Sequence, residues 1–281
     1  MIVDTHVHCS QASSADRPWD SSFDQKKLAG RSWPVEDILA EMHDCGIDRI
    51  TQVTPGIMGW DNRYSSEIAT ENDSVVAAFA RFDITMPDIA GRLRTLMTMP
   101  GLNGVRVTPM SPEERAWFSD GILDEFFTAA EQYSPIVAIY APHAPNEVIS
   151  LARRHPDVRI LVDHMLLFHG DSEPFRQWHE ILGMASAPNL FMKMSNFPEV
   201  ARDPFPYDSL HARIREAFET FGPERLMWGS NFPNCQRACT LKQAIDYVGA
   251  LDFLSGDDRR KILGESALAA FGTVSGASWT S

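Results

Sequence analysis

Near its N-terminus the chain reads Ile-Val-Asp-Thr-His-Val-His over residues 2–8. The apolar, β-branched start of this stretch favours a short strand. Side chains two positions apart in a strand point to the same side, so we expect His6 and His8 to project together from the strand's end. Two converging imidazoles can hold a divalent metal ion, or they can bind and polarise a carbonyl group. A pair of exposed histidines near a turn is the alternative interpretation of the same pattern.

Short apolar or β-branched runs recur along the chain and give eight strand candidates in all. After the first run they cover residues 49–53, 75–79, 105–107, 136–140, 159–162, 190–193 and 226–228. Segments with helical periodicity lie between them, and the segments at 35–45 and 210–221 each end before a glycine. Strands that alternate with helices pair in parallel. Eight such units predict an α/β fold, a (β/α)8 TIM barrel formed as a single domain by residues 1–281.

An open, doubly wound sheet is the alternative to a barrel for this alternation. Its nucleotide-binding form needs a Gly-x-Gly-x-x-Gly sequence after the first strand, and residues 9–34 contain none. These residues are rich in Ser and Asp, and we expect them to form a long loop beside the active site, at the C-terminal ends of the barrel strands. The small and polar residues 273–281 are expected to fray.

The composition and charge disfavour nucleic acid and membranes as partners. A formal net charge of −13 disfavours both nucleic acid and anionic membranes as partners. The N-terminus lacks the pattern of a signal peptide, and no apolar run approaches the length of a membrane span. Four cysteines without a disulfide-scaffold pattern fit a reduced, cytoplasmic protein. The expected partner is a small-molecule substrate, and the sequence leaves a homo-oligomer open.

Further polar residues stand at the predicted strand ends. His164 follows the sixth strand, where it would share a rim with the first two histidines, and a hydrogen-bonded core histidine is the alternative. Arg106 on the fourth strand suits a carboxylate of the substrate, although it could also form a structural ion pair. Lys193 and Ser195 could contact a substrate oxygen, and Lys193 could equally pair with an acid inside the barrel. Asn231 follows the eighth strand at a Gly-Ser turn that would aim it into the barrel mouth.

Three stretches of the chain resemble the amidohydrolase superfamily. They are residues 4–8, residues 151–157 leading into Val162-Asp163-His164, and residues 227–233. More narrowly, they resemble the amidohydrolase-2 group, which includes sugar lactonases, 2-pyrone-4,6-dicarboxylate lactonase and decarboxylases of the aminocarboxymuconate-semialdehyde type. The likeness covers nearly the whole chain. It implies a (β/α)8 barrel in which His6, His8 and His164 occupy active-site positions.

The chain departs from this family at two positions. The family usually carries Asp at position 231, as general base and as a ligand in metal-containing members, whereas this chain has Asn231. Metal-binding relatives present a histidine at the end of the fifth strand, where Tyr140 stands here, although His143 could reach in from the loop. The expected cofactor is therefore none or one divalent metal, Zn or Mn, and any such metal would be held by His6, His8 and His164.

The resemblance favours hydrolysis of a lactone, or of a related carbonyl C–O bond, in a small carboxylated or polyoxygenated substrate. Its expected catalytic residues are His6 and His8 to polarise the carbonyl, His164 as the substitute base, and Asn231 to position water or the oxyanion. The expected substrate-binding residues are Arg106, Tyr140, Lys193 and Ser195. A decarboxylase or other lyase is the second hypothesis, and a non-catalytic barrel that has lost its base is the third.

Overall fold

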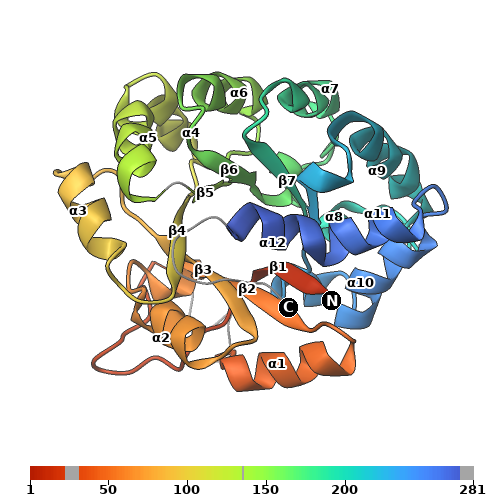
Figure 1. Cartoon of the computed structure of the whole chain (residues 1–281), viewed down its shortest axis with the longest axis horizontal. Helices are drawn as coiled ribbons and strands as arrows, with labels where there is room; N and C mark the ends of the chain where they lie inside the picture. The colour runs from red at the N-terminus through yellow and green to blue at the C-terminus, as the bar shows by residue number, and fades with distance from the viewer. Residues whose placement is uncertain (23–31, 135, 273–281) are drawn as a thin grey trace.

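Eight parallel strands of the described residues form one sheet, in which each strand pairs with the next along the sequence (Figure 1). The structure is a computed structural model that describes residues 1–22, 32–134 and 136–272. The strands are β1 Val3–Val7, β2 Arg49–Val53, β3 Val75–Arg81, β4 Leu102–Val107, β5 Ile136–Ile139, β6 Arg159–Val162, β7 Leu190–Met194 and β8 Leu226–Trp228. The predicted barrel and all eight predicted strand positions are confirmed. The expected fraying of 273–281, and part of the expected loop at 9–34, lie outside the described residues.

Contacts between the first and last strands close the barrel. Val7 forms a parallel bridge with Phe232, just beyond β8. The buried carboxylate of Asp4 accepts hydrogen bonds from the backbone N–H of Ser230 (2.9 Å) and of His6 (3.0 Å). Asp4 thereby links β1 to the turn after β8. Because the same carboxylate oxygen also accepts from the His6 backbone, the contact that closes the barrel fixes the position of His6 as well.

Helices cover the outside of the sheet (Figure 1). They are α1 Val35–Asp44, α2 Arg63–Glu71, α3 Ile89–Leu96, α4 Pro112–Arg115, α5 Ile122–Tyr133, α6 Pro145–Arg154, α7 Trp178–Gly183, α8 Phe197–Val200, α9 Asp208–Phe221, α10 Leu241–Ala250, α11 Gly256–Arg260 and α12 Ser266–Phe271. The predicted helices at 35–45 and 210–221 correspond to α1 and α9. Gly46, just beyond α1, has a φ of 78°, in the left-handed region expected of a glycine at a helix end. None of the helices in the described ranges is long and apolar enough to cross a membrane.

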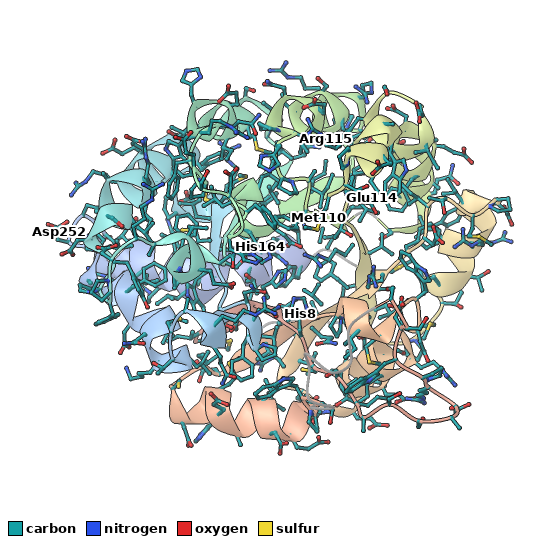
Figure 2. All side chains as sticks on the ribbon, turned by 180° about the vertical axis from the view of Figure 1, so that it is seen from behind. His8, Met110, Glu114, Arg115, His164 and Asp252 are labelled. Atoms are coloured by element: carbon teal, nitrogen blue, oxygen red, sulfur yellow. The ribbon has the colours of Figure 1, made fainter. Side chains whose placement is uncertain are left out.

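One end of the barrel is closed by α12, which lies across its centre in Figure 1. Ala270 and Phe271 of this helix pack against apolar side chains from inside the barrel, and the rings of Phe271 and Phe79 lie 5.9 Å apart. Viewed from behind, His8 and His164 lie near the centre of the opposite face (Figure 2). The apolar plug therefore leaves the end that carries the histidines as the open end of the barrel.

Gly104 on β4 provides a test of this close packing. A Cβ added there would overlap the Ile136 carbonyl oxygen and lie 2.9 Å from Cε1 of Phe79. We expect Gly104→Ala to lower the free energy of unfolding by about 2 kcal/mol, because the backbone oxygen cannot move aside cheaply. Urea denaturation followed by circular dichroism measures this loss.

The matched control is Gly249→Ala in α10, where an added Cβ meets nothing within 4 Å. Alanine is the better helix former, so this variant should be as stable as the parent or slightly more stable. Equal stability of the two variants would contradict the packing assigned to β4.

Candidate active site

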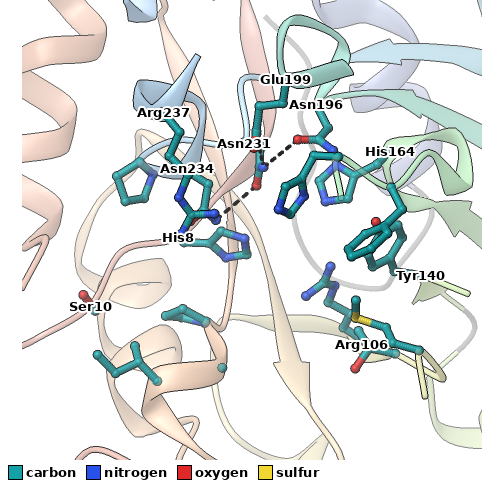
Figure 3. Close-up of a pocket in the computed structure, with 18 of the residues that line it drawn as sticks. His8, Ser10, Arg106, Tyr140, His164, Asn196, Glu199, Asn231, Asn234 and Arg237 are labelled. Atoms are coloured by element: carbon teal, nitrogen blue, oxygen red, sulfur yellow. Dashed lines mark hydrogen bonds between the residues drawn. The ribbon is translucent and has the colours of Figure 1, made fainter. Parts of the chain in front are cut away.

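A cavity of about 550 Å³ opens at the C-terminal ends of the strands, a size suited to a small-molecule ligand (Figure 3). The predicted site residues that line it are His8, Arg106, Tyr140, His164 and Asn231. The long loop after β1 adds Ser10 and Trp33, which bridge each other through their backbones. Three other predicted residues, His6, Lys193 and Ser195, are fully buried and are not among the described residues that line the cavity.

A buried charge cluster lies beneath the cavity, centred on Asp163 at the end of β6. One oxygen of its carboxylate accepts a hydrogen bond from Arg106 Nε (2.7 Å), and the other lies 3.0 Å from Lys193 Nζ. Lys193 also lies over the ring of Phe79, 5.3 Å from the ring centre, at the boundary with the apolar plug. Lys193 therefore pairs with an acid inside the barrel, the second of the two roles considered for it. Both roles considered for Arg106 are compatible with its position, because it forms an ion pair with Asp163 and also lines the cavity.

His6 and His8 meet through their Nε2 atoms, which are 3.2 Å apart. His8 Nδ1 lies 2.8 Å from the carbonyl oxygen of Val53, which can only accept, so the proton of the neutral His8 ring is on Nδ1. His6 Nδ1 lies 3.4 Å from Asp163. The two histidines converge as predicted, but His8 faces the cavity and His6 supports it from below.

His164 follows β6 in an unusual backbone conformation. Its φ is 57°, and the next two residues also have positive φ, which is costly for side chains other than glycine. This turn brings Nδ1 of His164 within 2.8 Å of Ser195 Oγ. The Ser195 hydroxyl can donate to Nδ1, which leaves the ring proton on Nε2. Ser195 is thus a partner of His164 rather than part of the cavity wall.

The imidazoles of the site are neutral near pH 7. Burial lowers the pKa of His8 to about 4 and that of His164 to about 3, and it holds the pKa of His6 well below its usual range. The positive charges of nearby groups, Arg106 among them, lower the pKa of His8 and of His164 further. Neutral imidazoles with such low pKa values can donate or accept hydrogen bonds, but they are weak bases.

Tyr140 and His143, the two candidates around the fifth strand, have different positions. Tyr140 lines the cavity, donates a hydrogen bond from its hydroxyl to the Leu167 carbonyl (2.9 Å), and packs edge-on against the His164 ring. His143 lies outside the cavity lining, with Nδ1 3.8 Å from a carboxylate oxygen of Asp171. Tyr140 therefore stands at the strand-end position, as the sequence predicted, and His143 does not reach in.

Asn231 lines the cavity with a φ of 63°, so the sharp turn after β8 aims it inward as predicted. Its Nδ2 donates a hydrogen bond to Oε1 of Glu199 (2.7 Å), and its Oδ1 accepts one from Asn234 (3.4 Å). Figure 3 shows Asn231 between Glu199 and Asn234. Glu199 was missed in the sequence analysis. It lies in the short helix α8, immediately beyond β7, and its position just past a strand end is a signal that could have found it.

Two arginines of the cavity were also missed. Arg81 ends β3, donates to the carbonyl oxygens of Gly56 and Gly59, and lies over the Trp60 ring. Arg237 lies in the loop after β8. No carboxylate of the described residues forms an ion pair with either of them. With Arg106 they give the cavity three guanidinium groups. Arg81 could have been found from its place at a strand end, whereas the sequence around Arg237 carries no such signal.

The histidines provide only part of a metal site. The 3.2 Å between the Nε2 atoms of His6 and His8 is close to the separation of two ligands of a tetrahedral ion, roughly 3.3 Å for bonds of about 2.05 Å. Among the described residues, however, no group of three His, Cys, Asp or Glu side chains has a geometry that could hold a metal ion. His164 therefore does not complete the expected set, and Asn231 offers only an amide, a poor ligand for zinc. The residues present do not fit a resident Zn or Mn.

Comparisons with known proteins agree with this architecture. The chain is similar to an L-fucono-1,5-lactonase of Burkholderia ambifaria, with 26% identity over 82% of this chain and 80% of that protein. It is also similar to a 4-sulfomuconolactone hydrolase of Rhizobium radiobacter, with 26% identity over 82% of this chain and 75% of that protein. Among solved structures, an amidohydrolase of Burkholderia multivorans with bound Zn superposes with a TM-score of 0.80 at 17% identity, over 97% of this chain and 99% of that one.

The family assignment rests on a match along nearly the whole chain. The model of the amidohydrolase family matches residues 3–273, from the start of β1 to just beyond α12. This range includes both the histidine segment of β1 and the turn after β8 that carries Asn231. The expected resemblance is confirmed, and the chain belongs to the amidohydrolase family.

Proposed function

We propose that this chain hydrolyses the ester bond of a lactone that carries a carboxylate or several oxygens. The observation that carries the proposal is the cavity at the open end of the barrel, where neutral imidazoles and three guanidinium groups face the same space. The similarity to an L-fucono-1,5-lactonase and to a 4-sulfomuconolactone hydrolase supports the choice of a lactone. Both names describe opening of a cyclic ester by water.

His8 and His164, two of the three histidines that line the cavity, have different hydrogen-bonding roles in this proposal. With Ser195 as the donor to Nδ1, His164 presents an Nε2–H to the cavity and can stabilise the negative charge that develops on the carbonyl oxygen during attack. His8 has its Nδ1–H engaged by Val53, so its Nε2 lone pair can accept from Nε2–H of His6 (3.2 Å), which holds the His8 ring in the cavity wall. His6 acts through His8, because it is buried below it. Asn231 holds Glu199 in place rather than taking a proton itself.

The charge of the cavity favours an anionic or oxygen-rich substrate. Arg81, Arg106 and Arg237 line it, and Glu199 is the only acidic residue among its described lining residues. Because Arg106 uses Nε to hold Asp163, its two terminal nitrogens are left to bind a carboxylate in the cavity. We propose that Arg106 anchors the substrate and that Tyr140 forms an apolar wall beside it.

We further propose that the reaction needs no resident Zn or Mn, since His6 and His8 lack a third ligand among the described side chains. The cytoplasmic location and the homo-oligomer considered from the sequence stay predictions. The lyase and the non-catalytic barrel stay alternatives, and the first experiment below separates them from hydrolysis.

Product analysis in oxygen-18 water tests the reaction class. With L-fucono-1,5-lactone and a 4-substituted muconolactone as substrates, hydrolysis places one labelled oxygen in the carboxylate of the product, because water attacks the carbonyl carbon. Mass spectrometry of the product detects the label. Incubating the unlabelled product with the enzyme controls for back-exchange. Release of carbon dioxide with an unlabelled organic product would show a lyase, and binding without turnover of either substrate would show a non-catalytic barrel.

Arg106→Lys tests the anchoring role. Lysine keeps a positive charge beside Asp163 but loses the planar fork, so we expect KM for a muconolactone, which carries a carboxylate, to rise about tenfold, equivalent to about 1.4 kcal/mol. KM for the uncharged fuconolactone should change less than about threefold by the same reasoning. Steady-state kinetics on both substrates measures the difference. Arg202→Lys is the matched control, since the Arg202 guanidinium donates to the Ser172 carbonyl away from the cavity lining. Equal changes in KM for both substrates would argue against a carboxylate contact.

A further inference from the structure

The cavity contains one carboxylate that the histidine chemistry leaves without a role. Glu199 lies half-buried in α8 and is the only Asp or Glu among the described residues that line the cavity. It forms no ion pair with a described lysine or arginine. The charges of Arg237 and His169 in the cavity lining favour the ionised carboxylate, but burial outweighs them. A half-buried carboxylate that is not ion-paired is unfavourable for stability alone, so its position calls for a chemical explanation.

Two carboxamides hold Glu199 in place. Asn231 Nδ2 donates to Oε1 (2.7 Å), and Asn196, with its nitrogen turned toward Glu199, donates to Oε2 (3.2 Å). Both asparagines have positive φ, at 63° and 70°, and both backbone turns direct an amide toward Glu199. Amides cannot take up a proton near neutral pH, so this pair orients the carboxylate without competing with it for protons.

His8 and His164, two of the three histidines that line the cavity, are poorly placed to activate water. His8 has Nδ1 on the Val53 carbonyl and Nε2 against that of His6, and Ser195 can donate to Nδ1 of His164. Neither ring then offers a free lone pair to a water molecule. His164, predicted from the sequence as the substitute base, is better suited to donate a hydrogen bond. Burial instead raises the pKa of Glu199 above the usual range of a glutamate, while its bond with Asn231 opposes that shift. A carboxylate of raised pKa is the stronger base.

We propose that Glu199 is the general base that activates water in this cavity, held for the task by Asn231 and Asn196. The inference rests on the proposed lactone hydrolysis and names the residue that moves its proton. An O–H bond of water breaks and its proton passes to Glu199 as the oxygen bonds to the carbonyl carbon. The ring C–O bond then breaks, and Glu199 returns the proton to the departing ring oxygen. The product is a hydroxy acid that ionises to its carboxylate, and no other reactant is needed.

Glu199→Gln keeps the size of the side chain but removes the base. We expect kcat to fall about 100-fold or more while KM changes little. The acid limb of the wild-type pH profile, where kcat/KM falls as Glu199 gains a proton, should be absent from the residual activity. Because burial raises this pKa, the limb should lie above the usual glutamate range. The control is Glu147→Gln, which changes an exposed glutamate in the first turn of α6 and should leave kcat and the limb unchanged.

His164→Gln distinguishes the two candidate bases. It should lower kcat but keep the acid limb, because the base is still present. A Glu199→Gln enzyme that keeps more than about a tenth of kcat, or that keeps the limb while His164→Gln loses it, would overturn the proposal. If the wild type incorporates oxygen-18 and Glu199→Gln still works, this inference alone fails. If the wild type opens no lactone, the proposed function fails instead.

The double variant Glu199→Gln with Asn231→Asp exchanges amide and carboxylate across the same 2.7 Å contact. It preserves the hydrogen bond and returns a carboxylate to the cavity, so we expect kcat to recover at least about tenfold over Glu199→Gln, together with an acid limb. Thermal unfolding of each variant checks that it is folded. A folded double variant as inactive as Glu199→Gln would contradict a base at this contact.

Discussion

Asp163 is the buried carboxylate on which the site depends. Its side chain is inaccessible to solvent, and Arg106 from β4, Lys193 from β7 and His6 from β1 all lie within 3.4 Å of it. Burial by itself would raise the pKa of Asp163, but the surrounding positive groups, Lys193 foremost, hold it well below the usual range. Removing one member of such a cluster leaves other buried charges unpaired, which typically costs several kcal/mol. The cluster therefore fixes the ends of four strands relative to one another.

The chemistry above this cluster follows from its charge. The positive groups that satisfy Asp163 also disfavour protonation of the imidazoles, and burial adds to this effect, so His8 and His164 remain neutral. The partners at Nδ1 fix the state of each Nε2, so that of His8 can accept from His6, and that of His164 carries a proton when Ser195 donates to Nδ1. In the proposed mechanism a separate carboxylate, Glu199, supplies basicity. Glu199 follows Lys193 of the cluster in the sequence but accepts its hydrogen bond from the Asn231 amide and forms no ion pair with a described Lys or Arg.

Much of the fold could be predicted from the sequence, because strand and helix periodicities are local properties. His6, His8, His164 and Asn231 were also predictable, since each stands at or just beyond a strand end that the pattern located. The sequence did not decide the partner of Lys193, because its ammonium group could pair either with an acid inside the barrel or with a substrate oxygen. Glu199 was missed although it stands just past the end of β7, whereas Arg237 lies in a segment whose path depends on tertiary contacts rather than on periodicity.

The central claim is that buried, neutral histidines and a nearby carboxylate perform this chemistry without a resident metal ion. The pairing of His6 with His8 resembles half of a zinc site, so metal content is the measurement that tests the claim most directly. Elemental analysis of the purified protein should be combined with lactone turnover before and after exhaustive chelation. The account predicts far less than one metal ion per chain and unchanged turnover. One tightly held zinc or manganese ion, with turnover lost on its removal and restored on its return, would contradict it.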